Sequence, residues 1–384
     1  MLTVQGWIVA LVAVALVAAG RLFGIVELYL LGAGAAGLVI GGAVTVWRTR
    51  LRLDIERSLH PQRVHAGSPS RVQLTITNRA RRRSPLLTLH DPVGDGRSAS
   101  VVVAPLRPGE SVQASYRLPT EQRGIVPVGP LAVRVADPFG LAALATPAAP
   151  LVDLTIWPAV DDVAPLPHTT GDDPHGGSDH PNALASSGDD FFALRPYVVG
   201  DDLRHVHWKS TARRDELIVR DDEMPWQGRA TIVLDTRAST HSARSFERAV
   251  SAAASIVVAT GRRRFLLRLL TTGGHDSGTG SGSAHLERLL ELLATVQLDE
   301  TGSIEAAARA LRRSASGVGA VAMLVGDVDP AAARRLGRGL GNTTTVVFRD
   351  GASAPTDSLV VDDDHAFPEV WARTLRRRPS AVTR

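Results

Sequence analysis

The chain of 384 residues contains no cysteine, which excludes a disulfide framework, a thiol nucleophile and any thiolate metal site. Aromatic residues make up only 4% of it, so apolar burial must come from leucine, valine, isoleucine and alanine. Phosphate-binding loops, dinucleotide-binding fingerprints, nucleophile elbows and zinc-protease motifs are all missing. The sequence therefore carries no positive indication of an enzyme, and we assign no catalytic residue.

Lysine is also nearly absent, because Lys209 is the only one and all other fixed positive charge is arginine. The formal net charge is only +4 at pH 7. The arginines are not interleaved with aromatic residues in a basic stripe, as they often are in nucleic-acid-binding proteins. We therefore expect no nucleic-acid partner. The length allows two or three domains.

Two long apolar segments stand at the N-terminal end of the chain. Residues 4–20 are apolar apart from Gln5, and residues 25–47 are apolar apart from Glu27, Tyr29 and Thr45. A helix needs about 17 residues or more to cross the hydrocarbon core. No basic residue precedes the first segment and the second follows at once, unlike a signal peptide. The pattern predicts two transmembrane helices within residues 1–50; the alternative is a signal anchor with one re-entrant or interfacial segment.

The charges that flank these segments predict their orientation. The short connection between them carries only Arg21 and Glu27. Past the second segment come Arg48, Arg50, Arg52 and Arg57. Positive flanks mark the cytoplasmic side, so we expect a multi-pass cell-membrane protein with both termini and the soluble domains in the cytoplasm. Trp7 and Trp47 lie at the outer ends of the pair, where interfacial indole rings are common.

Residues 51–157 have the pattern of an all-β domain. Apolar and polar residues alternate over 51–56, 71–77 and 111–118, which is typical of strands with one buried face. Glycine and proline mark turns between them, among others over 91–96. Short strands at this spacing predict an immunoglobulin-like sandwich.

Two loops of this domain are notable. Arg79-Ala-Arg-Arg-Arg83 is concentrated in positive charge. It is interpreted first as a solvated turn, and the alternative is contact with a membrane surface or an acidic partner. Asp137-Pro-Phe-Gly-Leu141 is expected to be a turn between two late strands.

The rest of the soluble chain divides into three parts. Residues 158–190 form a polar linker by composition, residues 191–228 hold a dense polar motif, and residues 229–384 alternate strand and helix. Such alternation predicts a doubly wound α/β domain with a mainly parallel sheet. The expected strands and helices cover 229–235, 245–264, 265–272, 285–298, 303–313, 320–325, 330–340, 344–348, 358–361 and 366–378.

The dense motif runs from Leu194 to Arg213 and contains Lys209. Its order of residues, Leu-Arg-Pro-Tyr, Gly-Asp-Asp, Arg204, Trp-Lys and Ala-Arg, resembles the signature of the bacterial domain-of-unknown-function-58 family. The residues interpreted as partner-binding are Arg195, Tyr197, Gly200, Asp201, Asp202, Arg204, Trp208, Lys209 and Arg213. The alternatives are a structural clamp, in which Trp208 anchors the segment in a crevice, and catalysis by the nearby histidines.

Polar residues also gather where the expected parallel strands end, which is where ligands bind in doubly wound sheets. The Asp235-Thr-Arg-Ala-Ser239 segment resembles the start of the metal-ion-dependent adhesion site of a von Willebrand factor A domain. The resemblance implies oxygen ligands, which suit Mg²⁺. They are Asp235, Ser239, Thr301 and Asp327, with Ser303 as the alternative to Thr301. Arg237 departs from the pattern because it replaces the first serine, and it could substitute for the cation by pairing with the aspartates.

Together these features predict a membrane-anchored, cytoplasm-facing binding or adaptor protein. The family resemblance implies a MoxR-type AAA+ ATPase as partner, and also a transglutaminase-like membrane protein, in protein assembly or cell-envelope maturation. The alternative function is a metal-dependent hydrolase that uses Asp235 and Asp327. No cofactor is expected unless the cleft binds Mg²⁺.

Overall fold

The structure is a computed structural model in which the chain forms two compact units. The first comprises Met1–Val160 and Leu290–Val296, and the second comprises Asp161–Leu289 and Gln297–Arg384. The structure describes residues 2–49, 51–167, 193–197, 206, 208–214, 216–221, 228–312, 319–328, 342–351 and 360–376. The helix expected over 330–340 and most of the expected polar linker lie outside these residues.

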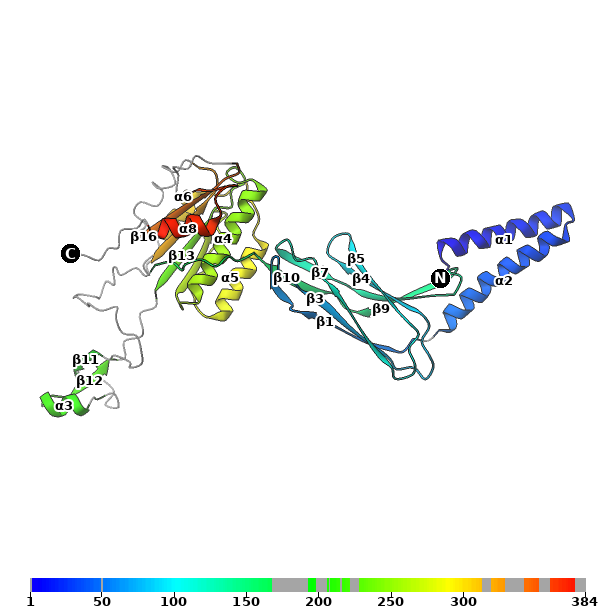
Figure 1. The fold of residues 1–384 in the computed structure, drawn as a ribbon, viewed down its shortest axis with the longest axis horizontal. Helices are drawn as coiled ribbons and strands as arrows, with labels where there is room; N and C mark the ends of the chain where they lie inside the picture. Colours follow the sequence, from blue (N-terminus) through cyan, green and yellow to red (C-terminus); the bar gives the residue numbers. More distant parts are fainter. Residues whose placement is uncertain are drawn as a thin grey trace. The chain divides into compact units, whose positions relative to one another are not determined.

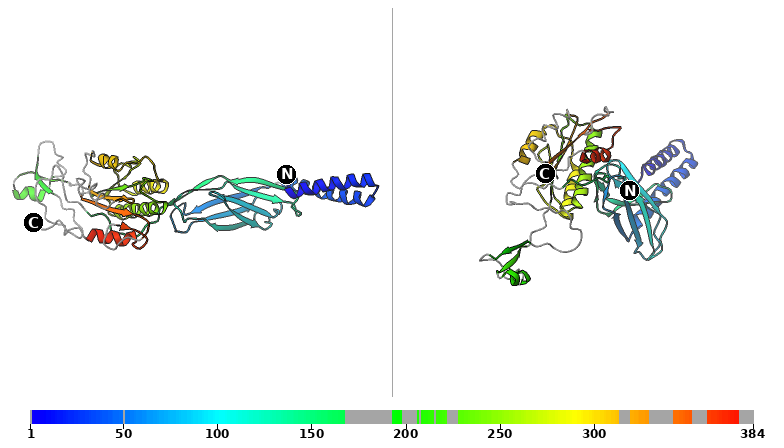
Figure 2. Two further views of the ribbon diagram at one scale, coloured as in Figure 1. Left: turned by 90° about the horizontal axis from the view of Figure 1, so that it is seen from above. Right: turned by 60° about the vertical axis from the view of Figure 1, so that its left-hand side comes forward.

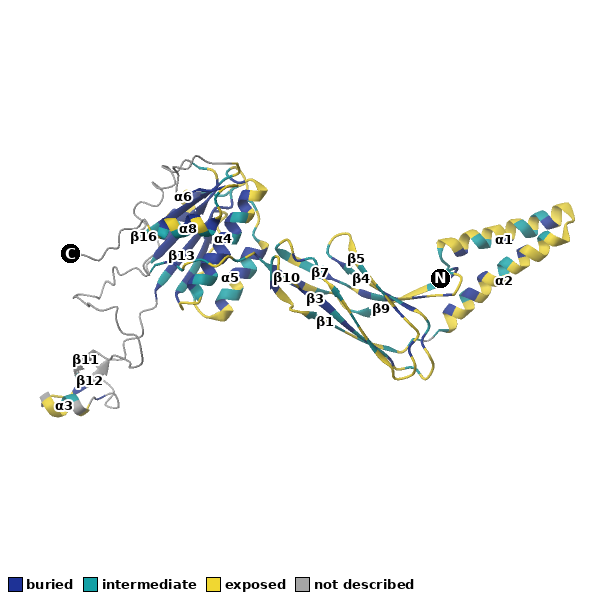
Figure 3. Cartoon of the chain, viewed as in Figure 1, coloured by how far each residue is buried: buried dark blue, intermediate teal, exposed yellow. Residues whose placement is uncertain are grey.

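The first unit begins with a helical hairpin of α1 (Val4–Phe23) and α2 (Val26–Arg48). The helices meet through small residues, since Gly20 of α1 lies against Tyr29 of α2 and Gly32 of α2 lies against Ala13 and Val17 of α1. Close packing through small side chains is common between helices in lipid. The remaining surface is mostly exposed and apolar (Figure 3). Both helices are long and apolar enough to cross a membrane.

The β-rich region follows, with ten strands in two sheets (Figure 1). A three-stranded antiparallel sheet has the order β1-β3-β6, with β1 at Leu53–His60, β3 at Arg71–Asn78 and β6 at Ser111–Arg117. The sequence pattern predicted these three strands, and the structure confirms them. The other sheet contains β2 (Arg63–His65), β4 (Leu87–Val93), β5 (Arg97–Val103), β7 (Gly124–Val128), β8 (Leu131–Ala136), β9 (Ala143–Ala149) and β10 (Val152–Trp157).

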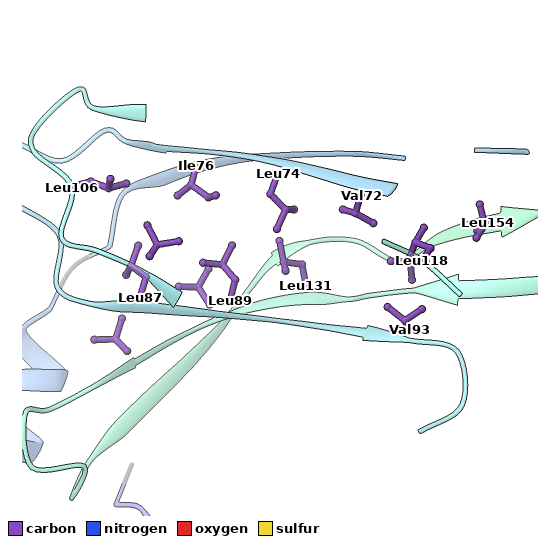
Figure 4. Packing of buried hydrophobic residues seen from close by; sticks show 14 of the residues in the cluster. Val72, Leu74, Ile76, Leu87, Leu89, Val93, Leu106, Leu118, Leu131 and Leu154 are labelled. Carbon is purple, nitrogen blue, oxygen red and sulfur yellow. The ribbon is translucent and has the colours of Figure 1, made fainter. Parts of the chain in front are cut away.

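The two sheets enclose an apolar core. Alternate residues of β3 point into it, as the two-residue period of a strand requires. They pack with alternate residues of β4 and β8, such as Leu89 and Leu131 (Figure 4). Burial of one such side chain contributes about 1.5–3 kcal/mol. The predicted reliance on aliphatic residues is met here, because no aromatic side chain is among the fully buried members of this cluster.

The turn expected over 91–96 is shorter than predicted. Asp91 to Val93 belong to β4, and only residues 94–96 form the turn. Asp91 points inward, where Arg57 Nη1 donates to its Oδ1 at 2.7 Å and the Tyr116 hydroxyl donates to its Oδ2 at 2.6 Å. Burial and the hydrogen bond to Asp91 raise the pKa of Tyr116. A proline after an aspartate suggested a turn, but Asp91, Pro92 and Val93 pair with β5 and so remain in the strand.

The second unit contains a five-stranded sheet in the order β14-β13-β15-β16-β17, and every neighbouring pair is parallel. This confirms the predicted parallel sheet. The strands are β13 (Arg229–Leu234), β14 (Leu266–Thr271), β15 (Ala320–Val325), β16 (Asn342–Phe348) and β17 (Val360–Val361). The helices are α4 (Ala243–Gly261), α5 (Ser283–Thr295), α6 (Ile304–Arg312) and α8 (Phe367–Arg376).

Helices lie on both faces of this sheet, and Figure 2 shows α6 and α8 on opposite sides. Ile304 and Leu311 of α6 pack on the face that carries Val321 and Val347. The adjacent Phe348 points the other way and contacts Phe367 of α8, with ring centroids 6.2 Å apart. The layers therefore follow from the alternation of side chains along each strand.

Residues 161–167, which were expected within the linker, lie against this unit. The backbone N–H of Asp161 donates to Ser255 of α4 at 2.9 Å, and that of Leu166 donates to Thr260 of the same helix at 3.3 Å. The Trp371 indole of α8 donates to the carbonyl of Ala164 at 2.7 Å. This stretch is therefore a packed strap across two helices.

Candidate functional site

The carboxyl end of β13 places Asp235 beneath the edge of the parallel sheet, with its side chain fully buried. Arg237 forms a bidentate pair with it, since Nε donates to Oδ1 and Nη2 donates to Oδ2, both at 2.8 Å. Two parallel charge-assisted bonds of this kind are among the stronger polar contacts in proteins. The guanidinium thus contacts both carboxylate oxygens and lies between Asp235 and the solvent.

Further donors complete the shell around this carboxylate. The Thr240 hydroxyl donates to Oδ2 at 3.0 Å, the Thr272 hydroxyl donates to Oδ1 at 3.1 Å, and the N–H of Gly326 donates to Oδ2 at 3.3 Å. A Cβ at position 326 would lie 2.2 Å from the carbonyl oxygen of Thr240, so only glycine allows this approach. Three separate strand ends therefore converge on Asp235, as the doubly wound topology predicts.

Electrostatics within this cluster favour the ionised carboxylate. Burial by itself would raise the pKa of Asp235, but the hydrogen bonds and charge of Arg237 outweigh it and hold the pKa below its usual range. The same hydrogen bond raises the pKa of Arg237. His241 is buried close by, with Nδ1 3.1 Å from the Ser245 hydroxyl, and burial lowers its pKa. The cluster therefore combines a charged pair with a neutral imidazole.

The segments that carry the four residues predicted as metal ligands lie close together, since the N–H of Ala238 donates to the carbonyl of Asp299 at 2.9 Å and that of Asp327 donates to the carbonyl of Thr240 at 2.7 Å. Their side chains either have partners within the protein or are exposed. Asp235 is engaged by Arg237, and Thr301 donates its hydroxyl to Asp299 at 2.8 Å. Asp327 is exposed and pairs with Arg349, with Nε and Oδ1 3.6 Å apart, and Ser239 is exposed. Among the described residues, no group of three or more histidine or carboxylate side chains could hold a metal ion. Both carboxylate oxygens of Asp235 pair with the guanidinium of Arg237, which supplies the positive charge that a metal ion would otherwise provide.

Thr240, Thr272 and His241 were missed by the sequence analysis. Thr272 lies 37 residues from Asp235 and Gly326 lies 91 residues away, so spacing alone offers no signal for them. Thr272 could have been found from its place in the fold, because it directly follows β14 at the same edge of the sheet.

The motif around Lys209 folds into a small module of β11 (Ala193–Pro196), α3 (Trp208–Arg214) and β12 (Ile218–Asp221). The strands pair antiparallel, and the N–H of Tyr197 extends the pairing by donating to Leu217 at 2.8 Å. The Thr211 hydroxyl of α3 accepts from the N–H of Ile218 at 3.1 Å. Buried Val206 and Ile218 supply apolar packing.

The surface of this module exposes Trp208, whose side chain is 68% accessible at the start of α3. Trp208 therefore lies in no crevice of the described residues, and its role as a structural anchor stays a prediction. Arg213 is exposed and Tyr197 is half-buried. The backbone of Arg195 lies in β11 and that of Lys209 in α3. The predicted residues Gly200, Asp201, Asp202 and Arg204 lie outside the described residues.

Comparison with known proteins gives a family match and several remote structural likenesses. Among curated proteins, none matches this chain. The CARDB domain of a Pyrococcus furiosus protein, solved with di-metal ions, has 13% identity over 28% of this chain and 93% of its own, with a TM-score of 0.21. The putative ApaA protein of Bordetella pertussis has 16% identity over 28% of this chain and 94% of its own, also with a TM-score of 0.21.

A β-glucosidase of Listeria innocua is similar over 27% of this chain and 17% of its own, with 13% identity and a TM-score of 0.18. Similarities of this size carry no argument about function. The family comparison is of a different kind, because it rests on the region of the motif and the parallel sheet. Residues 193–353, which are less than half of the chain, match the model described as protein of unknown function DUF58.

Proposed function

We propose that this chain is a membrane-anchored, cytoplasm-facing adaptor that binds a MoxR-type AAA+ ATPase, in protein assembly or cell-envelope maturation. The observation that carries the proposal is the exposed Trp208 within the family motif. A large aromatic side chain left in water on a small folded module is typical of the centre of a protein interface. The arginine-rich helix around it supplies the polar rim that such interfaces have.

Membrane anchoring is supported by the helical hairpin. Its lipid-facing surface is apolar, and the arginines that follow α2 favour a cytoplasmic location for both termini and for the soluble domains. We further propose that the β-rich region is an immunoglobulin-like sandwich and that the α/β region is a von Willebrand factor A-like domain. A transglutaminase-like membrane protein is a second proposed partner.

The hydrolase alternative depends on a metal at Asp235. The bidentate pair with Arg237 offers it no support. Hydrolytic activity that requires a divalent metal and is lost in the Asp235→Asn chain would favour this alternative over the adaptor.

The adaptor proposal is tested by binding between the full chain in nanodiscs and a purified MoxR-type ATPase from the same cell. Removal of an interface hot-spot aromatic weakens binding by about 30-fold, so we expect that loss for Trp208→Ala. Val102→Ala, which truncates an exposed apolar side chain in β5, is the matched control and should bind normally. Absence of binding by the wild-type chain would refute the proposal, and equal binding by Trp208→Ala would remove the motif from the interface.

A further inference from the structure

The arginine loop, residues 79–83, lies at the end of the β-rich region that α2 enters. Strand β1 pairs with β3 in a register that places Leu53 opposite Asn78, and the N–H of Arg79 donates to the carbonyl of Arg52 at 2.8 Å. Helix α2 ends at Arg48. Because an extended chain advances at most about 3.6 Å per residue, the loop begins within about 15 Å of the end of that helix.

The loop is held in one conformation by buried polar side chains at both of its ends. The Asn78 amide donates to the carbonyl of Arg82 at 2.9 Å and to that of Leu106 at 3.0 Å. Its Oδ1 accepts from the N–H of Ala80 at 3.0 Å. At the other end the Ser84 hydroxyl accepts from the N–H of Leu106 at 2.8 Å. Because the backbone of the loop is fastened in this way, binding through its arginines costs little further backbone entropy.

Positive charge dominates this end of the molecule. Arg81, Arg82 and Arg83 are all exposed. The exposed arginines nearby on the chain or on the adjoining loop are Arg48, Arg52, Arg79 and Arg107. Acidic groups are few: Asp54 pairs with Arg79 at 3.0 Å, and Glu110 accepts from the N–H of Arg107 at 2.6 Å. The surface therefore suits a negatively charged partner.

Exposed apolar side chains accompany the charge. Leu86 lies between the arginine loop and β4, and Phe139 lies in the turn that follows β8. That turn is joined to the helical hairpin, because the N–H of Thr3 donates to the carbonyl of Leu141 at 2.9 Å and its hydroxyl donates to that of Gly140 at 2.6 Å. Thr3 is the N-cap of α1. Phe139 is therefore fixed beside the first turn of a helix that would enter the bilayer.

We propose that the arginine loop, with Leu86 and Phe139, binds the acidic headgroups of the membrane that the helical hairpin spans. Arginines supply the electrostatic attraction and the two apolar side chains enter the interfacial layer, as in other basic-hydrophobic membrane contacts. The β-rich region is thereby held against the membrane surface instead of swinging on a short linker. This inference rests on the membrane anchoring in the proposed function, and it adds a second, lipid-specific contact.

The absence of cysteine makes a direct test available. A single Leu86→Cys substitution is labelled with an environment-sensitive fluorophore, and the full chain is placed in nanodiscs of phosphatidylcholine alone or mixed with phosphatidylglycerol. Lipids with a quencher in the headgroup region report contact. Leu11→Cys, on the lipid-facing surface of α1, reports insertion of the helical hairpin in parallel discs whose lipids carry the quencher on the acyl chain. Asp95→Cys, in the turn at the far end of β4, is the matched control, since the seven residues of this strand separate the two ends by about 20 Å.

We expect the Leu86 label to be quenched in the acidic discs, less in neutral discs, and less again at high salt, because salt screens such contacts. Each arginine near an acidic surface contributes about fivefold to the ratio of bound to free loop, so the Arg81→Gln/Arg82→Gln/Arg83→Gln chain should lose about a hundredfold. The Asp95 label should stay unquenched throughout.

The outcomes separate this inference from the proposed function. A quenched Leu11 label with an unquenched Leu86 label in acidic discs would overturn the lipid contact and leave the anchor intact. The lipid contact would also be overturned if quenching of the Leu86 label were equal in neutral and acidic discs and unchanged in the triple arginine variant. A loop that serves an acidic protein would give that first outcome, because the discs contain only lipid. An unquenched Leu11 label would overturn the anchor and this inference together.

Discussion

Each unit of the molecule contains a buried arginine–aspartate pair, and the two pairs differ in how they meet water. Arg57 and Asp91 lie between the sheets of the β-rich region, where the arginine side chain is only 1% exposed. Arg237 and Asp235 lie at the edge of the parallel sheet, where the arginine side chain is 19% exposed. The first pair is sealed within a core and the second is open on one side.

The difference extends to the donors around each carboxylate. Asp91 accepts from Arg57 and the Tyr116 hydroxyl, whereas Asp235 accepts from Arg237, two threonine hydroxyls and the Gly326 N–H. Loss of the arginine therefore leaves Asp91 with one side-chain partner and no route to water, but leaves Asp235 with several donors and access to solvent. Similar chemistry thus gives an enclosed pair in one unit and a pair whose arginine is partly exposed in the other.

The largest effect is expected from Arg57→Ala. Removing one partner of a sealed ion pair leaves an uncompensated charge and costs about 3–5 kcal/mol. Hydrogen exchange of the full chain in detergent measures the free energy of unfolding for each unit separately. The control is Arg79→Ala, which breaks the exposed pair with Asp54 and should cost no more than about 1 kcal/mol. Equal losses in the two variants would show that water reaches Asp91.

A smaller effect is expected from Arg237→Ala. The threonine hydroxyls and the Gly326 N–H remain on Asp235, so we expect the α/β unit to lose about 1–3 kcal/mol, the range for removal of a hydrogen-bond partner from a buried group. The same hydrogen-exchange measurement gives the value, and the β-rich region should be unchanged. A loss as large as that of Arg57→Ala would contradict the distinction between the sealed and the open pair.

The smallest effect is a pH dependence confined to the α/β unit. Burial lowers the pKa of His241, so the folded chain binds a proton less readily than the unfolded chain, whose histidine titrates near pH 6.5. Stability of this unit should therefore decrease as pH falls below about 6.5, whereas above that value this contribution stays constant. His241→Gln should remove that part of the decrease. If the stability of the α/β unit depended on pH identically in the wild-type chain and in His241→Gln, this prediction would be wrong.

Much of the secondary structure was predictable because its patterns are local. Two-residue alternation marked β3 and β6, and apolar runs marked β13 and β15, the latter with the observed bounds. The error at residues 91–93 had a different origin. Proline and glycine there resemble a turn, but residues 91–93 pair with residues 97–99 of β5, and the turn begins only at Gly94.

The candidate site was predictable in position and not in composition. Ligands bind at the carboxyl ends of parallel strands, and this pointed to Asp235. The sequence also showed that Arg237 stands where the adhesion-site pattern has a serine. The sequence did not show which aspartate pairs with Arg237. In the structure Arg237 pairs with Asp235, while Asp327 pairs with Arg349 from the neighbouring strand end.

The sequence by itself determined the hydrophobic hairpin segments, the strand and helix periods and the absence of thiol chemistry, because each depends on the residue types present or on their spacing within one element. Only the tertiary structure decided which charges are sealed and which are open, and that the arginine loop lies beside the end of α2. Those outcomes depend on strand register and sheet order, which join residues tens of positions apart and leave no local pattern.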